Sequence, residues 1–322
     1  MGSELLSVLT PVYNGLAFLP RCHRTLLLQT FTNWEWIIVD DGSTDGTADA
    51  ARELARHDDR IRVFSHTPNR GRGYARTRTL EHARADWSVV WDVDDFYHPH
   101  RLEVVDQARA GGADFTCSYA HIVDNNLRVK GVRGFFPFLG LTGFVHATLA
   151  GRTDLIRSIG YDSRLTTVGQ IGEDHRIGLV LPSRHRGHYH HGVLMINQED
   201  REVFLLKAIH SNGVRLRVLG ELARAGVFPV PECQWRTELR RLRLKLAALN
   251  AMRVCPSVYL RTVRHRGYGA VTPGYTPSPE DMAFLDLIRA EFAPSRPSAV
   301  ASPDLPSVVV RSSAPAAWPA RR

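Results

Sequence analysis

The first ninety positions alternate between short apolar runs and segments in which apolar residues recur every three or four positions. The runs lie at 6–10, 36–39, 61–64 and 87–91. Each run predicts a buried strand, and the spacing between them predicts a helix after each of the first three, with Ser43 or Thr44 as the N-cap of the second helix. Strand and helix alternating at this pace imply right-handed crossovers and a mostly parallel sheet. The pattern therefore predicts an α/β fold.

Polar and acidic residues follow three of these expected strands. They lie at Thr10–Asn14, Asp40–Ser43 and Asp92–Asp95. In a parallel sheet the carboxyl ends of the strands meet at one edge, and ligands bind there. Three loops that converge on one edge predict a binding site formed within roughly the first hundred residues.

The rest of the chain changes character twice. Further strands are expected at 115–119 and 144–149, and then an arginine-rich helical pattern begins. After Pro294 the chain is mostly proline, serine and alanine, a composition typical of disorder. We expect an α/β domain at 1–200 with halves at 1–110 and 111–200, a mainly helical region at 201–293 and a disordered tail at 294–322.

The sequence Asp92-Val93-Asp94-Asp95 directly follows the fourth expected strand. In an extended chain, residues i and i+2 point to the same side, so Asp92 and Asp94 can face one ligand together. Neighbouring carboxylates repel unless one is protonated or a cation bridges them, and hard oxygen ligands suit Mg²⁺ or Mn²⁺. The cluster predicts a divalent-metal site. The alternative is a solvated acidic turn that caps the following helix.

Several segments, taken together, resemble those of family 2 glycosyltransferases, which are inverting enzymes of the GT-A (Rossmann-like) fold. The matching segments are Ser7–Asn14, Ile37–Asp45, Asn69–Gly71 with Ala75-Arg76, Asp92–Asp95, Ile159–Asp162 and Gly172–Asp174. They occur in the family's order and spacing over about residues 5–195. The resemblance implies a GT-A sheet flanked by helices, with a nucleotide-sugar half at 1–110 and an acceptor half at 111–200.

The resemblance also assigns residues to the donor. The positions that match the family's nucleotide-base pocket are Pro11, Tyr13, Asp40 and Asp41. Asp41 is the expected partner of a uracil ring. Arg76 matches an arginine near the donor phosphates, although Thr77 stands where the family usually has asparagine. Asp92 matches a carboxylate at the metal and ribose-diphosphate, and Asp94 matches the direct ligand of the metal.

Asp174 matches the family's catalytic base. Independently of the resemblance, Glu173 and Asp174 precede a helical pattern, and helix N-termini stabilise carboxylates as anions. An ionised carboxylate within reach of the acceptor is what a general base requires. Which of the two residues is the base stays open, and simple capping of the helix is the alternative.

Four histidines fall within seven residues: His185, His188, His190 and His191. Some GT-A enzymes complete the metal shell with a histidine after the base helix, so His191, or else His190, is a candidate ligand. A separate zinc site is a weaker alternative because no cysteine is near and a strand would place the last two on opposite faces. The simplest alternative is an exposed arginine-rich loop with no metal.

The net charge of +8 is carried almost entirely by arginine, since only three of the 41 basic residues are lysines. The charge is concentrated at Arg236–Arg243 and Arg184–His191. An anionic diphosphate or a phospholipid surface would explain it as well as nucleic acid would, and we expect no nucleic-acid partner. The sequence has no signal-like start and no apolar run long enough for a membrane span. We therefore expect a cytoplasmic protein, with the inner membrane face as an option.

These observations and the family resemblance predict an enzyme that moves one sugar from a nucleotide-sugar to an acceptor hydroxyl or amine, with inversion and help from Mg²⁺ or Mn²⁺. The resemblance implies a UDP-sugar as the donor. A glycan, a lipid-linked molecule and a small natural product are all open as acceptors. The alternatives are a sugar nucleotidyltransferase and a non-catalytic nucleotide-sugar-binding protein on the same fold. A nucleotidyltransferase usually has a basic glycine-rich loop after its first strand, whereas Pro11–Gly15 contains no basic residue.

Overall fold

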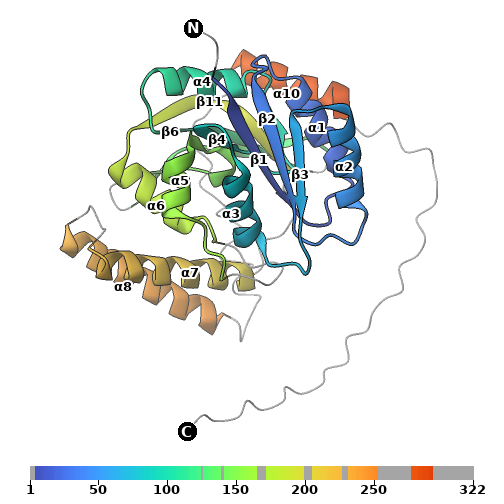
Figure 1. Cartoon of the computed structure of the whole chain (residues 1–322). Coiled ribbons are helices and arrows are strands. Elements are labelled where there is room, and N and C mark those ends of the chain that lie inside the picture. The colour runs from blue at the N-terminus through green and yellow to red at the C-terminus, as the bar shows by residue number, and fades with distance from the viewer. Residues whose placement is uncertain are drawn as a thin grey trace, which may run out of the picture.

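A nine-stranded sheet with helices on both faces forms the body of the molecule (Figure 1). The computed structural model describes residues 4–124, 126–138, 141–164, 172–198, 205–226, 231–252 and 277–292. The strands of this sheet are β1 (Leu6–Val12), β2 (Trp34–Asp40), β3 (Ile61–Ser65), β4 (Trp87–Val90), β5 (Phe96–Tyr97), β6 (Phe115–Val123), β7 (Val129–Arg133), β10 (Ala150–Arg152) and β11 (Gly187–Gln198). A small separate sheet pairs β8 (Phe136–Phe138) with β9 (Leu141–Gly143).

The helices connect these strands and continue beyond them. They are α1 (Leu19–Leu27), α2 (Thr47–His57), α3 (Arg72–His82), α4 (Arg101–Ala110), α5 (Thr153–Ile159), α6 (His175–Arg184), α7 (Leu205–Arg224), α8 (Glu232–Ala251) and α10 (Pro279–Phe292), with a 3₁₀ turn, η1, at His146–Thr148. Within the described residues, none of these helices combines the length and the apolar character needed to cross a bilayer.

The strands run in the order β3-β2-β1-β4-β10-β6-β11-β5, and β7 pairs with β6. The first four are parallel, as the strand–helix repeat predicts. The second half is mixed, because β10 is antiparallel to both β4 and β6 while β11 is parallel to β6. The expected four strands are thus confirmed, and the parallel character holds for the first half of the sheet.

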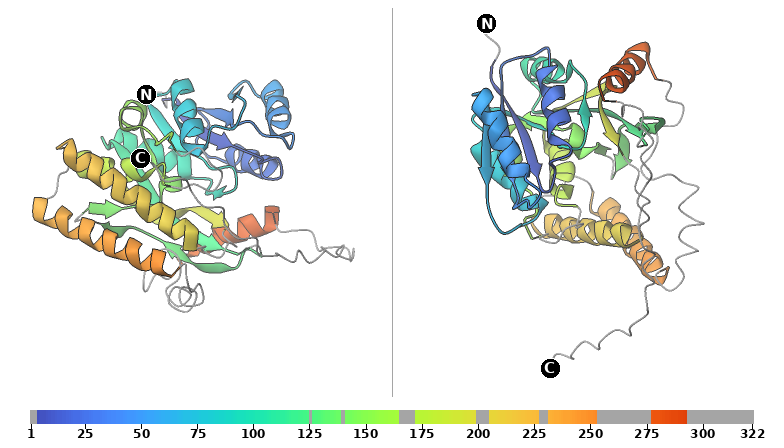
Figure 2. Two further views of the ribbon diagram at one scale, coloured as in Figure 1. Left: turned by 90° about the horizontal axis from the view of Figure 1, so that it is seen from below. Right: turned by 90° about the vertical axis from the view of Figure 1, so that its right-hand side faces the viewer.

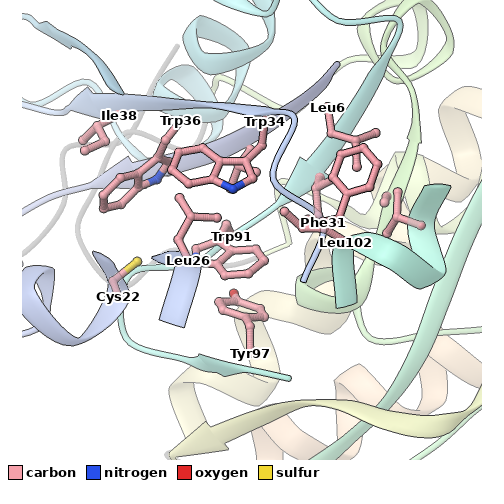
Figure 3. Close-up of a cluster of buried hydrophobic side chains, with 14 of the residues drawn as sticks. Leu6, Cys22, Leu26, Phe31, Trp34, Trp36, Ile38, Trp91, Tyr97 and Leu102 are labelled. Atoms are coloured by element: carbon pink, nitrogen blue, oxygen red, sulfur yellow. The ribbon is translucent and has the colours of Figure 1, made fainter. Parts of the chain in front are cut away.

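Alternating side chains of the central strands build two cores, one on each face. Trp36 and Ile38 of β2 face α1, α2 and α4, whereas Ile37 and Val39 face α3, α5 and α6. Such strands, buried on both faces, read as continuous apolar runs. Figure 3 shows the first core, in which Trp91 lies against Tyr97 with ring centroids 3.8 Å apart. This packing fixes the strand ends that carry the polar loops.

Two local expectations are wrong. Residues 144–149 form no strand: the Thr148 hydroxyl donates to the carbonyl of Val145, and the chain makes the turn η1 before β10. Helix α2 begins at Thr47 rather than after Ser43 or Thr44, because Gly46 has a φ of 92° and the Asp45 carboxylate accepts from the Thr47 amide. A left-handed residue cannot continue a helix, so the helix begins after it.

The helical region expected at 201–293 is confirmed where it is described, whereas the tail expected at 294–322 lies outside the described residues. Helices α7 and α8 form a hairpin whose apolar side chains pack with Leu179 of α6. Helix α10 returns to the sheet, where Phe284 and Ile288 pack against Phe96 of β5. The region thus contacts the sheet domain at two separate places.

Gly73 marks the closest approach of α3 to the segment before α6. A Cβ atom here would lie 2.1 Å from the backbone oxygen of Asp162 and 3.2 Å from the Cβ of Glu173. Since the obstructing atom belongs to the backbone, Gly73→Ala is expected to lower the free energy of unfolding by about 1–3 kcal/mol in denaturant titrations. The control is Gly220→Ala in α7, where a Cβ meets nothing within 4 Å. Equal losses in both variants would contradict this close approach.

Candidate functional site

The loops after β1 and β2 are braced against each other. Val12 and Asp40 end these strands as register partners, and the Asp41 amide donates to the Val12 carbonyl at 2.8 Å. Asn14, with a φ of 50°, donates its amide to the Ser43 hydroxyl at 2.8 Å. Its side-chain oxygen accepts from the amide of Thr44. Tyr13 lies between these contacts in the sequence and is 39% exposed, so its ring is accessible to a ligand at this edge of the sheet.

Asp40 and Asp41 are both buried, and their carboxylates hold the neighbouring loops. Asp41 accepts hydrogen bonds from His66 Nε2 at 2.7 Å and from the amides of Arg70 and Gly71 at 2.8 and 2.9 Å. Asp40 accepts from the Ser43 amide. Asp41 therefore fixes the loop that leads into α3, a role that sequence analysis missed. Base recognition by this pair stays a prediction.

Arg76 of α3 links the two halves of the domain. Its Nη2 lies 2.9 Å from Asp92 Oδ1, and its Nε lies 3.2 Å from Glu173 Oε1. The guanidinium is nearly enclosed, with 6% of the side chain exposed. Burial alone would lower the pKa of Arg76, but the charges of Asp92 and Glu173 outweigh it and raise the pKa. Arg76 is a fixed buried cation between the end of β4 and the start of α6.

Asp92 to Asp95 form a turn, not the extended segment that sequence analysis assumed: β4 ends at Val90, and the Asp95 amide reaches back to the Asp92 carbonyl. Desolvation and the charge of Asp92 raise the pKa of Asp94. Solvent reaches Asp94, whereas Asp95 is buried and accepts from Asn197 at 2.6 Å. The Arg21 guanidinium donates to the Asp94 carbonyl and helps to hold the turn.

Asp174 is the N-cap of α6, but its side chain makes no capping hydrogen bond. Glu173 has its carboxylate engaged instead, by Arg76 and by the Gly172 amide at 3.1 Å. Simple capping therefore does not account for Asp174. Its side chain is 29% exposed and lies 3.6 Å from the His175 ring. Of the two neighbouring acids, Asp174 has the carboxylate that is free to meet a ligand.

Three basic side chains interact electrostatically with Asp174. Burial raises the pKa of its carboxyl, but His146, His175 and Arg76 outweigh burial and hold the pKa below its ordinary value. Burial lowers the pKa of both histidines, so at neutral pH the permanent positive charge comes from Arg76. Asp174 is therefore a carboxylate at neutral pH.

His146 and Tyr161 complete the wall of this site. His146 Nε2 lies 3.0 Å from the Tyr161 hydroxyl, and Arg76 lies 5.8 Å from the centre of the Tyr161 ring. Sequence analysis gave no role to Tyr161, although it lies within the matched segment Ile159–Asp162. His146 interacts electrostatically with both Asp92 and Asp174. His146 lies in the turn η1, where sequence analysis expected a strand at 144–149.

His191 contacts different residues from those around Asp92 and Asp174. The histidine-rich segment is part of strand β11, not an exposed loop, and it pairs with β6. His191 Nδ1 lies 2.9 Å from the Tyr119 hydroxyl, and its ring packs edge-on against Phe135. Throughout the described ranges, no three side chains of histidine, cysteine, aspartate or glutamate converge as a cation site. Coordination of a metal by Asp92, Asp94 and His191 together stays a prediction.

Comparison with known proteins identifies the domain. The model of "Glycosyl transferase family 2" matches residues 7–152, which span β1 to β10 and include every candidate donor residue. Residues 7–152 are a glycosyltransferase family 2 domain. The putative glycosyltransferase EpsH of Bacillus subtilis is 36% identical over 121 residues. That match spans 37% of this chain and only 35% of EpsH, so the chain aligns with about a third of this relative's length.

Solved structures share the fold over most of the chain. Staphylococcus aureus TarS 1-349 in complex with UDP-GlcNAc has a TM-score of 0.59 at 17% identity, over 88% of this chain and 81% of that one. The mannosyltransferase PcManGT of Pyrobaculum calidifontis, in complex with GDP-Man and Mn²⁺, has a TM-score of 0.55 at 16% identity, over 91% and 88% of the two chains. The GT-A fold expected from the sequence is thereby confirmed.

The acidic turn of this family 2 domain fits a divalent cation. Mg²⁺ is commonly held by one or two carboxylates together with substrate phosphates, rather than by a complete protein cage. Asp92 and Asp94 offer such a pair: burial and then the charge of Asp92 raise the pKa of Asp94, and a cation would offset that charge. Asp92 also keeps its contact with Arg76. These two carboxylates thus suit Mg²⁺ or Mn²⁺, and such an ion would keep coordination positions for phosphate oxygens.

Proposed function

We propose that this chain is a glycosyltransferase that moves a single sugar from a nucleotide-sugar donor to an acceptor hydroxyl or amine, with inversion at the anomeric carbon. The observation that carries the proposal is the position of Arg76. It joins Asp92 of the donor half to Glu173, next to Asp174, in the acceptor half. Groups suited to a departing diphosphate and a carboxylate suited to deprotonation therefore share one site.

The donor half has the groups that a nucleoside diphosphate needs. Tyr13 presents an exposed ring beside Pro11 for the base, and the loop held by Asp41 borders it. Arg76 supplies a permanent positive charge near the diphosphate. Asp92 and Asp94 would hold Mg²⁺ or Mn²⁺, which neutralises negative charge on the leaving diphosphate. A uridine nucleotide is our first choice of donor.

Asp174 acts as the general base. Its ionised carboxylate takes the proton of the acceptor as the acceptor oxygen or nitrogen attacks the anomeric carbon. The bond from that carbon to the diphosphate oxygen breaks on the opposite face, and the nucleoside diphosphate leaves with the electron pair. Arg76 lies between Asp92 and Glu173. The carboxylates on the Asp92 side therefore serve the leaving group, and Asp174, next to Glu173, serves the acceptor.

The solved structures of similar fold support a nucleotide-sugar donor, since TarS is in complex with UDP-GlcNAc and PcManGT with GDP-Man and Mn²⁺. A nucleotidyltransferase is disfavoured because the loop after β1 contains no basic residue, and the next one, Arg21, is engaged with Asp94 and Gln198. A purely binding protein is disfavoured because Asp41, Asp92, Asp94 and Asp174 are all present and the Asp174 side chain makes no capping hydrogen bond. A glycan, a lipid-linked molecule and a small natural product stay open as acceptors.

A thermal-shift screen of UDP, GDP and ADP, each with and without Mn²⁺, tests the donor. Ligand at about a hundred times its Kd stabilises a protein by about 2.7 kcal/mol, which for a chain of this size raises the Tm by roughly 4 °C. We expect the largest shift with UDP and Mn²⁺ together and a smaller shift with UDP alone. Equal small shifts for all three nucleotides, unaffected by Mn²⁺, would contradict the proposed donor site.

A further inference from the structure

Helix α8 carries a strongly basic outer surface. Its twenty residues include five basic residues against two acidic ones. The exposed basic and apolar residues of this helix define the α8 outer face: Arg236, Arg240, Arg241, Arg243, Leu244, Lys245, Ala247, Ala248 and Ala251. All of them are exposed, whereas Leu239, Leu242 and Leu249 of the same helix are buried against the hairpin core. The helix is therefore amphipathic, with a basic side turned to solvent.

The α8 outer face also has an apolar centre line. At 100° per residue, Leu244, Ala248 and Ala251 lie along the middle of the exposed side. Arg240 and Arg243 border this line on one side, and Arg241 and Lys245 border it on the other. Leu244 is 72% exposed, more than any other large hydrophobic side chain within the described residues. A leucine held in water between two rows of cations is costly for a helix that faces only solvent.

The cations of the hairpin crowd one another. Desolvation and the neighbouring charge of Arg215 on α7 lower the pKa of Lys245, with Glu238 opposing them. The carboxylate that Arg241 approaches, that of Glu238, is 3.9 Å away. The excess of positive charge on this helix favours an anionic partner that neutralises it. Arginine and lysine stems that cover apolar surface while their charged ends reach outward are typical of helices at membrane interfaces.

We propose that the α8 outer face docks onto an anionic phospholipid surface. The apolar line is set shallowly among the headgroups, and the flanking arginines bind the lipid phosphates. An anionic polymer is the weaker choice, because it would use the cations and leave Leu244 in water. The proposal does not depend on the proposed enzymatic activity, since it concerns a surface on the far side of α7 from the base helix (Figure 2).

The docking surface is joined to the acceptor half through α7. Arg217 of α7 pairs with Asp162, Glu221 pairs with Arg164, and His175 beside Asp174 reaches Ser211. Helices α7 and α8 in turn share one apolar core and lie side by side in both views of Figure 2. A membrane bound at α8 would thus be held at a fixed offset from the start of α6.

Vesicle sedimentation tests the proposal directly. The full chain is mixed with phosphatidylcholine vesicles, with and without phosphatidylglycerol, at low and high salt. We expect it to sediment only with the anionic vesicles and to be released by salt. Each basic residue near an anionic surface raises the binding constant roughly fivefold. The double variant Arg240→Glu with Arg243→Glu should therefore weaken vesicle binding on the order of thirtyfold or more. Leu244→Ser should weaken binding at low salt although it removes no charge.

The matched control reverses two arginines on another exposed helix, Arg52→Glu with Arg56→Glu in α2, which should leave vesicle binding within about twofold. Arg240, Arg243 and Leu244 are exposed, and unchanged thermal unfolding of their variants will show that the hairpin is intact. Three results would overturn the proposal: no binding to anionic vesicles, an equal loss in the α2 control, or binding to soluble polyphosphate with none to vesicles.

Discussion

Replacing Asp174 by asparagine is expected to reduce kcat for sugar transfer by about 10²–10⁴-fold while leaving the affinity for the nucleotide-sugar unchanged. The amide has nearly the shape of the carboxylate but cannot accept the acceptor's proton, and general-base catalysis contributes rate factors of this order. The side chain makes no capping bond, so the helix loses little. Steady-state kinetics with separate donor titration measure both quantities.

Glu173→Gln is the matched control for this variant. Glu173 is buried and pairs with Arg76, so its amide would weaken the hold on that guanidinium rather than remove a base. We expect the KM for the donor to rise while kcat falls less than in Asp174→Asn. The reverse ranking, with kcat lost in Glu173→Gln and retained in Asp174→Asn, would transfer the role of base to Glu173.

Asp94→Ala is expected to remove metal-supported turnover, with a loss of at least about a hundredfold in kcat/KM, since a bound cation contributes several kcal/mol of stabilisation to a leaving diphosphate. A chelator should have a comparable effect on the unmodified enzyme and little further effect on the variant. Turnover that survives both treatments would refute the metal role. Titration of activity with Mn²⁺ and with Mg²⁺ supplies the measurement.

The control for Asp94→Ala is its neighbour, changed to an isosteric amide in Asp95→Asn. Burial and the charges of Asp94 and Asp92 raise the pKa of Asp95 well above its ordinary value. The Asp95 side chain is also buried and engaged with Asn197, so it is not available to the cation and the metal dependence should be unchanged in Asp95→Asn. A loss equal to that of Asp94→Ala would show that total negative charge, rather than Asp94 itself, holds the cation.

The donor half is predictable from sequence because its chemistry follows directly from local pattern. Apolar runs buried on both faces give the strands of the parallel sheet, and the residues directly after them must then meet at one edge. The register of Val12 with Asp40 follows from this rule. Even here the partners of Asp41 could not be predicted, because they are backbone amides of a loop whose path depends on tertiary packing.

The acceptor half is less predictable because its contacts join distant segments. Arg76 meets Glu173 across 97 positions, and no local pattern indicates that pair. The contact of His191 with the Tyr119 hydroxyl likewise depends on where β11 lies against β6, and its role as a metal ligand stays a prediction. His146, assigned to a strand, lies instead on a turn that brings it to Tyr161.

Release of nucleoside diphosphate from a panel of UDP-, GDP- and ADP-sugars tests the central claim most directly. With Mn²⁺ and no acceptor, water substitutes slowly as the acceptor, so the unmodified chain should release diphosphate from one nucleotide class. Asp94→Ala and Asp174→Asn should each abolish that release. Tight binding of a nucleotide-sugar with no release, or inorganic diphosphate formed from a nucleoside triphosphate and a sugar phosphate, would contradict the assignment as a glycosyltransferase.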